Sequence, residues 1–301
     1  MTVRPVVGDA GKEIPPAPPV PPSAEAVMAR AAGENFPVAS RLLPRVEREH
    51  LLAVYGFARL VDELGDDPRC SPAERLQALD WLEGELDAAL AGSARHPLMA
   101  RLSRTVSQCG LGREPFARLI EANRTDQRRD RYGTWEQLRA YCALSADPVG
   151  EIVLAIFGHT EPELIALSDR ICTALQLAEH CQDVAEDLAR GRVYLPQEDL
   201  ERFGCSEQDL HRGHASAELR AVLAFEVERG RVLLRQGLPL LARMRGRERL
   251  AVAGFAAGGR AAFDAIERAS FDVLPGPPRA STPRRLSALA VTLAAAKARD
   301  A

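Results

Sequence analysis

Two pairs of aspartates with four-residue spacing constrain this chain more than any other feature. Asp62 and Asp66 stand near the end of one apolar-periodic segment, and Asp183 and Asp187 near the end of another. Residues four apart share a helix face with Cβ atoms about 5–6 Å apart, where like charges repel. The negative end of the helix macrodipole disfavours anions there as well. A divalent cation between the carboxylates would reverse both effects.

The segments that carry the two pairs have the periodicity of amphipathic helices. In ALQLAEHCQDVAEDLARGRVYLP, residues 174–196, apolar residues recur every three or four positions, and the helix is expected to end at Gly191. HLLAVYGFARLVDELGDD, residues 50–67, repeats this pattern and stops before Pro68. One such pair is often only a solvated helix face. Two pairs, each on the last turns of a largely apolar helix, favour a metal site.

Composition favours an all-α fold. Alanine, leucine and arginine dominate, whereas β-branched and aromatic residues are sparse in most long segments. With 46% hydrophobic and 27% charged residues, the chain has an ordinary globular composition. Because the acidic helix occurs twice with other helices between the copies, we expect one helical bundle around an apolar cavity rather than two domains.

We expect the folded part to span residues 24–275. Residues 1–23 contain PPAPPVPP and are predicted to be a disordered, partly polyproline II tail. Residues 276–301 combine a proline-rich linker with a short apolar segment, Leu286–Ala296, behind two arginines. For that segment an interfacial helix at a membrane surface, packing against the protein body and fraying all stay open.

Capping signals and prolines mark the expected helices. Ser71-Pro72-Ala73-Glu74 is a capping box with proline at the first helical position, and Thr134 is a further N-cap. SADPVG, residues 145–150, is expected to interrupt a helix. The expected helices span residues 25–32, 46–65, 72–90, 96–109, 114–126, 135–144, 151–158, 162–188, 217–241 and 248–270, with short helical pieces between 199 and 210.

Charge and cysteine usage exclude several classes of function. The net charge of −3 and the lack of a basic stripe interleaved with aromatic residues give no reason to expect nucleic acid. The six cysteines form no CxxC pair, so we expect free thiols in a reducing cytoplasm and no thiolate zinc site. Neither a signal-peptide h-region nor an apolar run of about 18 residues is present, so a cytoplasmic, at most membrane-associated, protein is expected.

Paired carboxylates predict a chemistry that uses magnesium and diphosphate. Mg²⁺ bridges a few carboxylates to substrate phosphates while it keeps some of its waters. Two facing pairs would hold two or three Mg²⁺ ions and one diphosphate. On an allylic diphosphate the metal charge promotes ionisation to a carbocation, which needs a dry, apolar cavity. The candidate diphosphate contacts, each of which fits a surface position equally well, are Arg59, Arg190, Arg192 and Tyr194.

Three segments of the chain resemble the squalene/phytoene synthase family of head-to-head prenyl synthases. They are YGFARLVDELGD (55–66), YCALSADPVG (141–150) and LQLAEHCQDVAEDLARGRVYLP (175–196). NFPVASRLLP (35–44) and AIERASFDVL (265–274) match less strictly. The resemblance covers about residues 25–275 and implies a single all-α isoprenoid-synthase domain.

The resemblance also implies roles for residues at the matching positions. The Mg²⁺ ligands and catalytic carboxylates would be Asp62, Asp66, Asp183 and Asp187. The diphosphate would be supported by Tyr55, Arg59, Gln176 and Arg192. Glu179 and Tyr194 are added to the substrate site from the sequence itself, because Glu179 lies one turn before Asp183 and Tyr194 is a candidate diphosphate contact. The prenyl chains would be bordered by Phe36, Tyr141, Val149 and Gly150, of which Tyr141 is also counted as catalytic.

Within the family, ENFPVASRLLP, EHCQDVAEDLARGRVYLP and AVAGFAAGGRAA look most like the hopanoid-pathway branch. That branch ionises presqualene diphosphate, supplied by a sister enzyme, and water captures the rearranged cation as hydroxysqualene. No NADPH is expected, and the lack of a GxGxxG fingerprint agrees with this. Where family members usually have Asn and Arg, this chain has Glu179 and Gln182, which disfavours the preceding condensation step.

Two alternatives stay open at this point. The chain could condense farnesyl or geranylgeranyl diphosphate completely, as squalene and phytoene synthases do. It could also be a non-catalytic assembly factor on the same fold, although a scaffold has no need for carboxylates at unfavourable helix ends. The expected partners are therefore a prenyl diphosphate and sister pathway enzymes, while peripheral contact with a membrane surface stays open.

Overall fold

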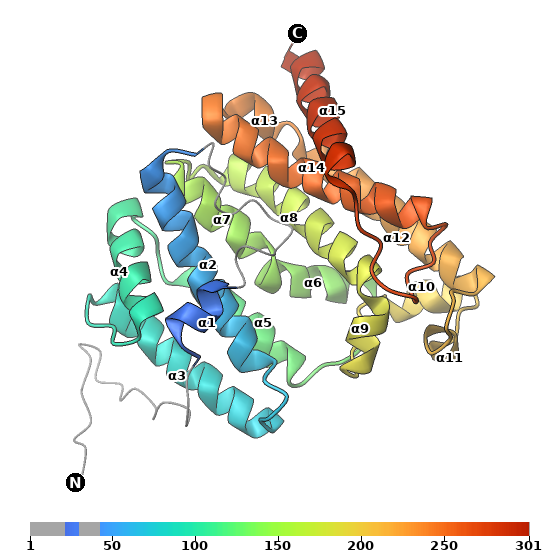
Figure 1. Cartoon of the computed structure of the whole chain (residues 1–301), viewed down its shortest axis with the longest axis horizontal. Helices are drawn as coiled ribbons and strands as arrows, with labels where there is room; N and C mark the ends of the chain where they lie inside the picture. The colour runs from blue at the N-terminus through green and yellow to red at the C-terminus, as the bar shows by residue number, and fades with distance from the viewer. Residues whose placement is uncertain (1–21, 30–42, 301) are drawn as a thin grey trace. The chain divides into compact units, whose positions relative to one another are not determined.

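The computed structural model describes residues 22–29 and 43–300, and the regular elements within them are all helices (Figure 1). Strand-type pairing in this part of the chain is limited to one isolated bridge, between Arg131 and Val193. The prediction of an all-α fold is confirmed. The helices are α1 (Ala24–Ala29), α2 (Arg45–Gly65), α3 (Pro72–Leu90), α4 (Pro97–Cys109), α5 (Glu114–Asp126), α6 (Trp135–Ser145), α7 (Asp147–Ile156), α8 (Pro162–Gln182), α9 (Val184–Ala189), α10 (Gln197–Arg202), α11 (Glu207–Leu210), α12 (Ala217–Gly237), α13 (Leu240–Arg243), α14 (Gly246–Arg268) and α15 (Thr282–Asp300).

The chain divides into two compact units. The first ends at Arg128 but also takes in Glu151–Thr160, and the second comprises Arg129–Gly150 and the chain from Glu161 onward. The boundary after Gly150 falls inside α7. The expected domain limits of 24 and 275 stay a prediction, and the expected N-terminal tail lies, up to residue 21, outside the described residues.

In the first unit, apolar positions at helical spacing form the core. Leu79, Leu82 and Leu86 recur every three or four residues along α3, and each is completely buried. Phe57 of α2 meets Phe116 of α5 edge to face, with ring centroids 5.2 Å apart. The predicted capping box at Ser71 is confirmed, because its side chain accepts from the Glu74 N–H while Glu74 accepts from the Ser71 N–H.

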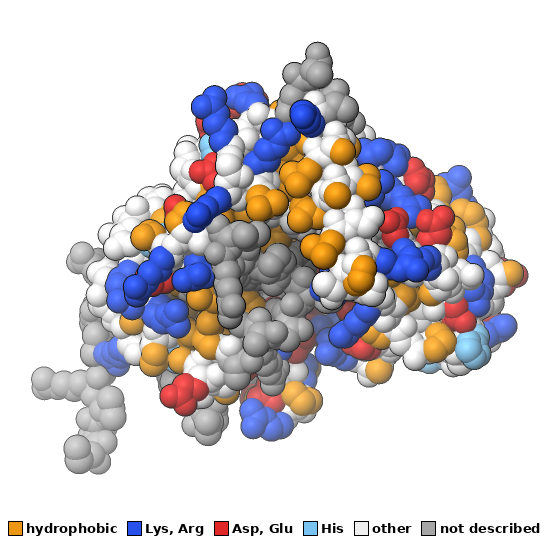
Figure 2. All heavy atoms as spheres, turned by 45° about the horizontal axis from the view of Figure 1, so that its top comes forward, with side chains coloured by type: hydrophobic (Ala, Val, Ile, Leu, Met, Phe, Trp, Pro, Cys, Tyr) orange, Lys and Arg blue, Asp and Glu red, His pale blue; other side chains and the backbone are white. Residues whose placement is uncertain are grey.

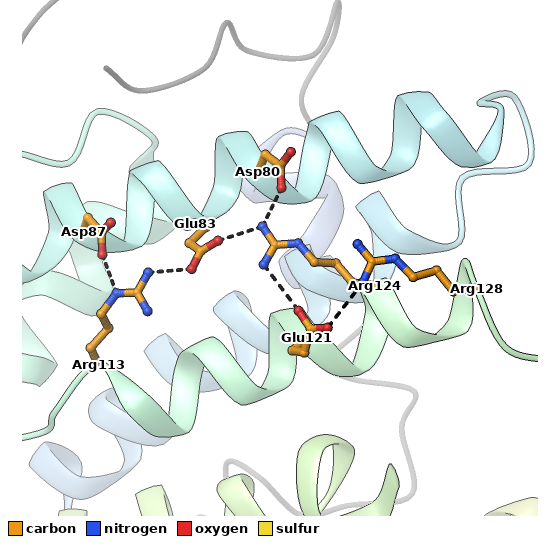
Figure 3. Close-up of polar contacts among 7 residues, drawn as sticks. All are labelled: Asp80, Glu83, Asp87, Arg113, Glu121, Arg124 and Arg128. Carbon is orange, nitrogen blue, oxygen red and sulfur yellow. Dashed lines mark hydrogen bonds and ion pairs between the residues drawn. The ribbon is translucent and has the colours of Figure 1, made fainter. Parts of the chain in front are cut away.

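Arginines and carboxylates alternate between α3 and α5 (Figure 3). Arg113 donates to Asp87 at 2.6 Å and to Glu83 at 2.5 Å. Arg124 donates to Glu83 at 2.7 Å and to Asp80 at 2.5 Å. Arg124 thus joins two helices through an ion network.

The second unit is built around α8, α12 and α14, which lie side by side in Figure 1. α12 follows α8 so closely that a Cβ atom on Gly237 would lie 2.8 Å from the backbone oxygen of Leu167. α15 packs on α14 and also contacts α13. Over the described residues, none of the helices combines the length and the hydropathy needed to cross a membrane.

All six cysteines are free thiols, and three of them are buried in the second unit. The buried ones are Cys142, Cys181 and Cys205. Burial raises the pKa of Cys142 to about 12, so this thiol stays protonated. The prediction of free cysteines is confirmed.

Three helix boundaries differ from the expected ones. The helix expected over 162–188 is divided at Asp183, whose ψ of 18° leaves the helical range. α7 begins at Asp147 instead of after Gly150, because a proline is tolerated in the first helical turn. The helix expected over 217–241 ends at Gly237, and Pro239 precedes the separate α13.

Candidate active site

The first aspartate pair occupies the last turn of α2, in the first unit. Asp66 is the C-cap, and its backbone N–H donates to the carbonyl of Asp62 at 2.9 Å, which keeps the two residues one turn apart. Gln127 donates to the carbonyl of Gly65 at 2.9 Å and so closes this helix end. A Cβ on Gly65 would lie 2.1 Å from Oδ1 of Asn123, so glycine is required for this approach.

Asp62 is exposed and Asp66 half-buried. Two more of the predicted site residues lie on α2: Tyr55 is buried, and Arg59 is half-buried with its Nε 3.6 Å from Glu63. All four residues come from the last three turns of one helix. Phe36, the remaining predicted site residue of this part of the chain, lies outside the described residues.

The second pair lies at the junction of α8 and α9, in the second unit. The N–H of Asp187 donates to the carbonyl of Asp183 at 2.8 Å, so this pair also spans one helical turn. Asp183 caps the C-terminal end of α8, where the macrodipole is unfavourable, whereas Asp187 lies within the short α9. Asp183 is also the N-cap of α9, so the unfavourable dipole expected for both residues applies only to Asp183 at the end of α8 and not to Asp187 in the first turn of α9.

The carboxyl group of Asp183 lies in a poorly solvated position. Burial first, and then the carboxylate of Glu186, raise its pKa, while Arg279 and Arg190 act in the opposite direction. The neighbouring Gln182 donates from Nε2 to the carbonyl of Pro278, which ties this end of α8 to the segment before α15. Glu179, one turn earlier, is exposed.

Four aromatic rings form a cluster that includes His180 and Tyr194, which flank the second aspartate pair in the sequence. His180 of α8 stacks on Tyr194 with ring centroids 4.0 Å apart and an interplanar angle of 15°. Tyr194 also stacks on Tyr132 at 5.8 Å, and the Tyr141 ring lies 5.4 Å from each of these two tyrosines. The Nε2 atoms of Gln176 and His180 are 3.4 Å apart. The structure thus brings the predicted residues Gln176, Tyr141 and Tyr194 together around His180.

Backbone hydrogen bonds hold the Tyr194 segment in place. The N–H of Val193 donates to the carbonyl of Asp130 at 2.9 Å, and the N–H of Gln197 donates to that of Tyr132 at 2.8 Å. These bonds align residues 130–133 with residues 193–197, so that two tyrosines distant in sequence stack. Arg192 in this segment is half-buried, and its N–H donates to the carbonyl of Asp187 at 2.9 Å.

His180 is buried and uncharged. Burial lowers its pKa to about 3, so the imidazole is neutral at physiological pH. The sequence analysis gave no role to His180 or to Tyr132. The signal for His180 was its position one turn after Gln176 on an apolar helix face, where a polar side chain needs partners.

Val149 and Gly150 lie in the first turns of α7. Val149 is 37% exposed, whereas a Cβ on Gly150 would lie 2.3 Å from Oγ of Ser168 and 2.5 Å from Sγ of Cys172. The buried Asp147 holds this turn, since it accepts from Oγ1 of Thr173 at 2.9 Å and pairs with Arg139. The missing side chain of Gly150 therefore allows α7 to approach α8.

The carboxylate pairs fit Mg²⁺ that binds together with a diphosphate. Among the described residues, no three His, Cys, Asp or Glu side chains gather closely enough to hold a metal ion. Mg²⁺ is often held by only one or two carboxylates, with substrate phosphates and waters completing its coordination. At Asp183 a cation would also offset the raised pKa. Each pair would offer two carboxylates on adjacent helical turns.

Comparison with known proteins gives the class of this all-α protein. The family model for squalene/phytoene synthase matches residues 29–286. Hydroxysqualene synthase of Rhodopseudomonas palustris is 34% identical over 213 residues, 70% of this chain and 72% of that protein. Phytoene synthase of Arthrospira platensis is 33% identical over 211 residues, 66% of this chain and 68% of that protein.

A solved structure extends the similarity. The crystal structure of squalene synthase HpnC from Alicyclobacillus acidocaldarius superposes with a TM-score of 0.76 and is 43% identical. The match covers 84% of this chain and 95% of that one. The chain belongs to the squalene/phytoene synthase family of enzymes, which condense prenyl diphosphates head to head and use divalent metal ions.

Proposed function

We propose that this enzyme converts presqualene diphosphate to hydroxysqualene and inorganic diphosphate, with Mg²⁺ and without NADPH. The carbon–oxygen bond to the diphosphate breaks, and its electron pair leaves on the diphosphate oxygen. The cation rearranges, water adds through its oxygen, and the added water releases one proton to the diphosphate or to solvent. No electrons are gained or lost overall, so the reaction needs no nicotinamide.

The observation that carries this proposal is the 43% identity with squalene synthase HpnC across 84% of the chain. The hydroxysqualene synthase of Rhodopseudomonas palustris supports it at 34% identity. The similarity to a phytoene synthase at 33% makes complete condensation of farnesyl or geranylgeranyl diphosphate the second candidate. A non-catalytic assembly factor is the third, and the presence of all four aspartates speaks against it.

The acidic pairs and their neighbours are assigned to the diphosphate. Bound Mg²⁺ would neutralise the leaving diphosphate, and Asp62, Asp66, Asp183 and Asp187 would hold it. Arginine suits the diphosphate oxygens because its guanidinium donates two parallel hydrogen bonds. The further residues assigned to diphosphate binding are Tyr55, Arg59, Gln176, Glu179 and Arg192.

The aromatic cluster is assigned to the carbocation. An aromatic ring attracts a cation through its face and Tyr141, which is tilted against its neighbours, is assigned this role, while Tyr194 stacks on His180 and borders the same cluster. The neutral His180 beside them adds no competing positive charge, because its pKa is lowered to about 3. Phe36, Val149 and Gly150 are assigned to the border of the prenyl chains.

Product analysis distinguishes the candidate reactions. The purified full chain receives Mg²⁺ without NADPH, and farnesyl, geranylgeranyl or presqualene diphosphate in separate reactions. We expect hydroxysqualene from presqualene diphosphate only. Presqualene diphosphate or a C30 hydrocarbon from farnesyl diphosphate, or a C40 product, would identify a complete synthase. No turnover of any substrate would favour the assembly factor.

Two substitutions test the acidic pairs. Asp62→Asn and Asp183→Asn each remove one carboxylate oxygen ligand and should lower turnover by about a hundredfold or more, with the helical circular dichroism unchanged. Glu163→Gln, which removes an exposed carboxylate from the first turn of α8, is the matched control and should leave turnover unchanged. An unaltered rate in either aspartate variant would contradict the metal assignment.

A further inference from the structure

The C-terminal helix α15 is bound to the protein by one narrow face. Ala288, Thr292 and Ala296 are buried at four-residue spacing along it. Ala288 packs in one cluster with Ala257 and Ala261 of α14. Small residues at these positions bring the two helices close together, so α15 has a fixed inner side and a fixed outer side.

The outer side of α15 is apolar where a solvent-facing helix is normally charged. Leu286 is 63% exposed and Val291 is 44% exposed. Ala290, which lies between them, and Ala294, which follows Val291, are exposed as well. Only five large hydrophobic side chains are exposed in the described part of the chain, and these are two of them. Figure 2 shows hydrophobic side chains gathered along this helix with basic side chains at their margins.

Positive charge concentrates in and around this helix. From Val273 to Arg299 the sequence contains no Asp or Glu, while the basic residues there are Arg279, Arg284, Arg285, Lys297 and Arg299. The corner between α13 and α14, which α15 also contacts, adds Arg243, Arg245, Arg247 and Arg249 against the single Glu248. The whole chain has a net charge of −3, so this basic character is local.

We propose that the outer side of α15, with the basic corner between α13 and α14, docks onto the surface of an anionic lipid bilayer. An amphipathic helix binds such a surface when its apolar side chains enter the acyl boundary and its basic residues reach anionic headgroups. A second copy of the chain fits less well, because a two-fold contact would bring the same basic residues face to face. This inference does not depend on the reaction proposed above.

Vesicle sedimentation of the full chain tests the docking. We expect the protein to sediment with vesicles of phosphatidylcholine and phosphatidylglycerol at low salt, and at least about tenfold less with phosphatidylcholine alone. Leu286→Glu/Val291→Glu and Arg284→Glu/Lys297→Glu should each lower the partition coefficient at least about tenfold. All four residues are exposed, so both variants should remain folded.

Val46→Glu is the matched control, since Val46 is 60% exposed on α2 and belongs to the other unit. It should bind vesicles as the unaltered protein does. The proposal is overturned by failure to bind anionic vesicles, by equal binding to neutral ones, or by undiminished binding of the α15 variants. A dimer in solution that Leu286→Glu dissociates would also overturn it, in favour of a second copy.

Discussion

His180 shows how one buried side chain ties stability to pH. In the folded chain it lies against Tyr194 with only 5% of its surface exposed, and its pKa falls to about 3. In the unfolded chain an imidazole titrates near its ordinary value of about 6.5. Below about pH 6.5, the imidazole of the unfolded state therefore binds a proton, whereas the buried imidazole of the folded state does not. The free energy of unfolding therefore decreases as the pH is lowered from about 6.5 to about 3.

We therefore predict that His180→Phe makes the protein less sensitive to acid. The free energy of unfolding of the unaltered protein should fall between pH 7 and pH 5 by about 2 kcal/mol more than that of the variant. Urea denaturation at the two pH values measures the difference. His211→Phe, at an exposed position on the same unit, should follow the unaltered protein. Parallel profiles for His180→Phe would show that His180 is not a neutral buried group.

Sequence reasoning could propose only those residues of the candidate site whose type and spacing suggest a role. The two DxxxD pairs needed only the helical period, Tyr194 was a candidate because it follows the second pair closely, and Tyr141 came from the resemblance. His180 and Glu226 could not be found in this way. Glu226 stands in AFEVERG, which is typical of a solvated helix face, yet it is fully buried beside Arg229 and Asp199. Burial raises its pKa to about 8, and only the packing of α12 against other helices determines that burial.

At the scale of the helices, the sequence did not reveal the close packing between α8 and α12. Helix positions followed from periodicity, proline and capping residues, and most boundaries agree within two residues. The division at Asp183 does not follow from local sequence, because Val184 and Leu188 continue the apolar pattern through it. The need for glycine at position 237 likewise cannot be read from the local sequence, because it arises from the close approach of the α8 backbone.

We predict that Gly237→Ala destabilises the protein by about 1–3 kcal/mol, because the added methyl group overpacks the contact with α8. The new Cβ would lie 2.8 Å from the Leu167 oxygen and 2.5 Å from Cγ1 of Ile171, and the backbone atom cannot rotate away. Gly258→Ala in α14 is the control, since no atom lies within 4 Å of its Cβ position. That variant should gain about 0.5–1 kcal/mol from helix propensity. Equal unfolding midpoints for the two variants in urea would contradict the packing argument.

At the scale of the whole molecule, the two aspartate pairs belong to different units of the chain. α2 with Asp62 and Asp66 belongs to the first unit, and the α8–α9 junction with Asp183 and Asp187 belongs to the second. Our functional assignment gives both pairs the same role toward Mg²⁺ and diphosphate. A ligand that binds only the folded state increases the free energy of unfolding. The shared role can therefore be tested by the unfolding temperature, without measuring turnover.

We predict that Mg²⁺ and inorganic diphosphate together raise the unfolding temperature by several degrees, and that either alone raises it much less. At a hundredfold excess over the dissociation constant the gain is about 2.7 kcal/mol, which corresponds to a few degrees for a chain of this size. Our proposal assigns both pairs to one diphosphate, so Asp62→Asn/Asp66→Asn and Asp183→Asn/Asp187→Asn should each abolish the shift, while Glu163→Gln retains it. A full shift in either double variant would mean that the two pairs do not act on one diphosphate, even if the enzyme turns over as proposed.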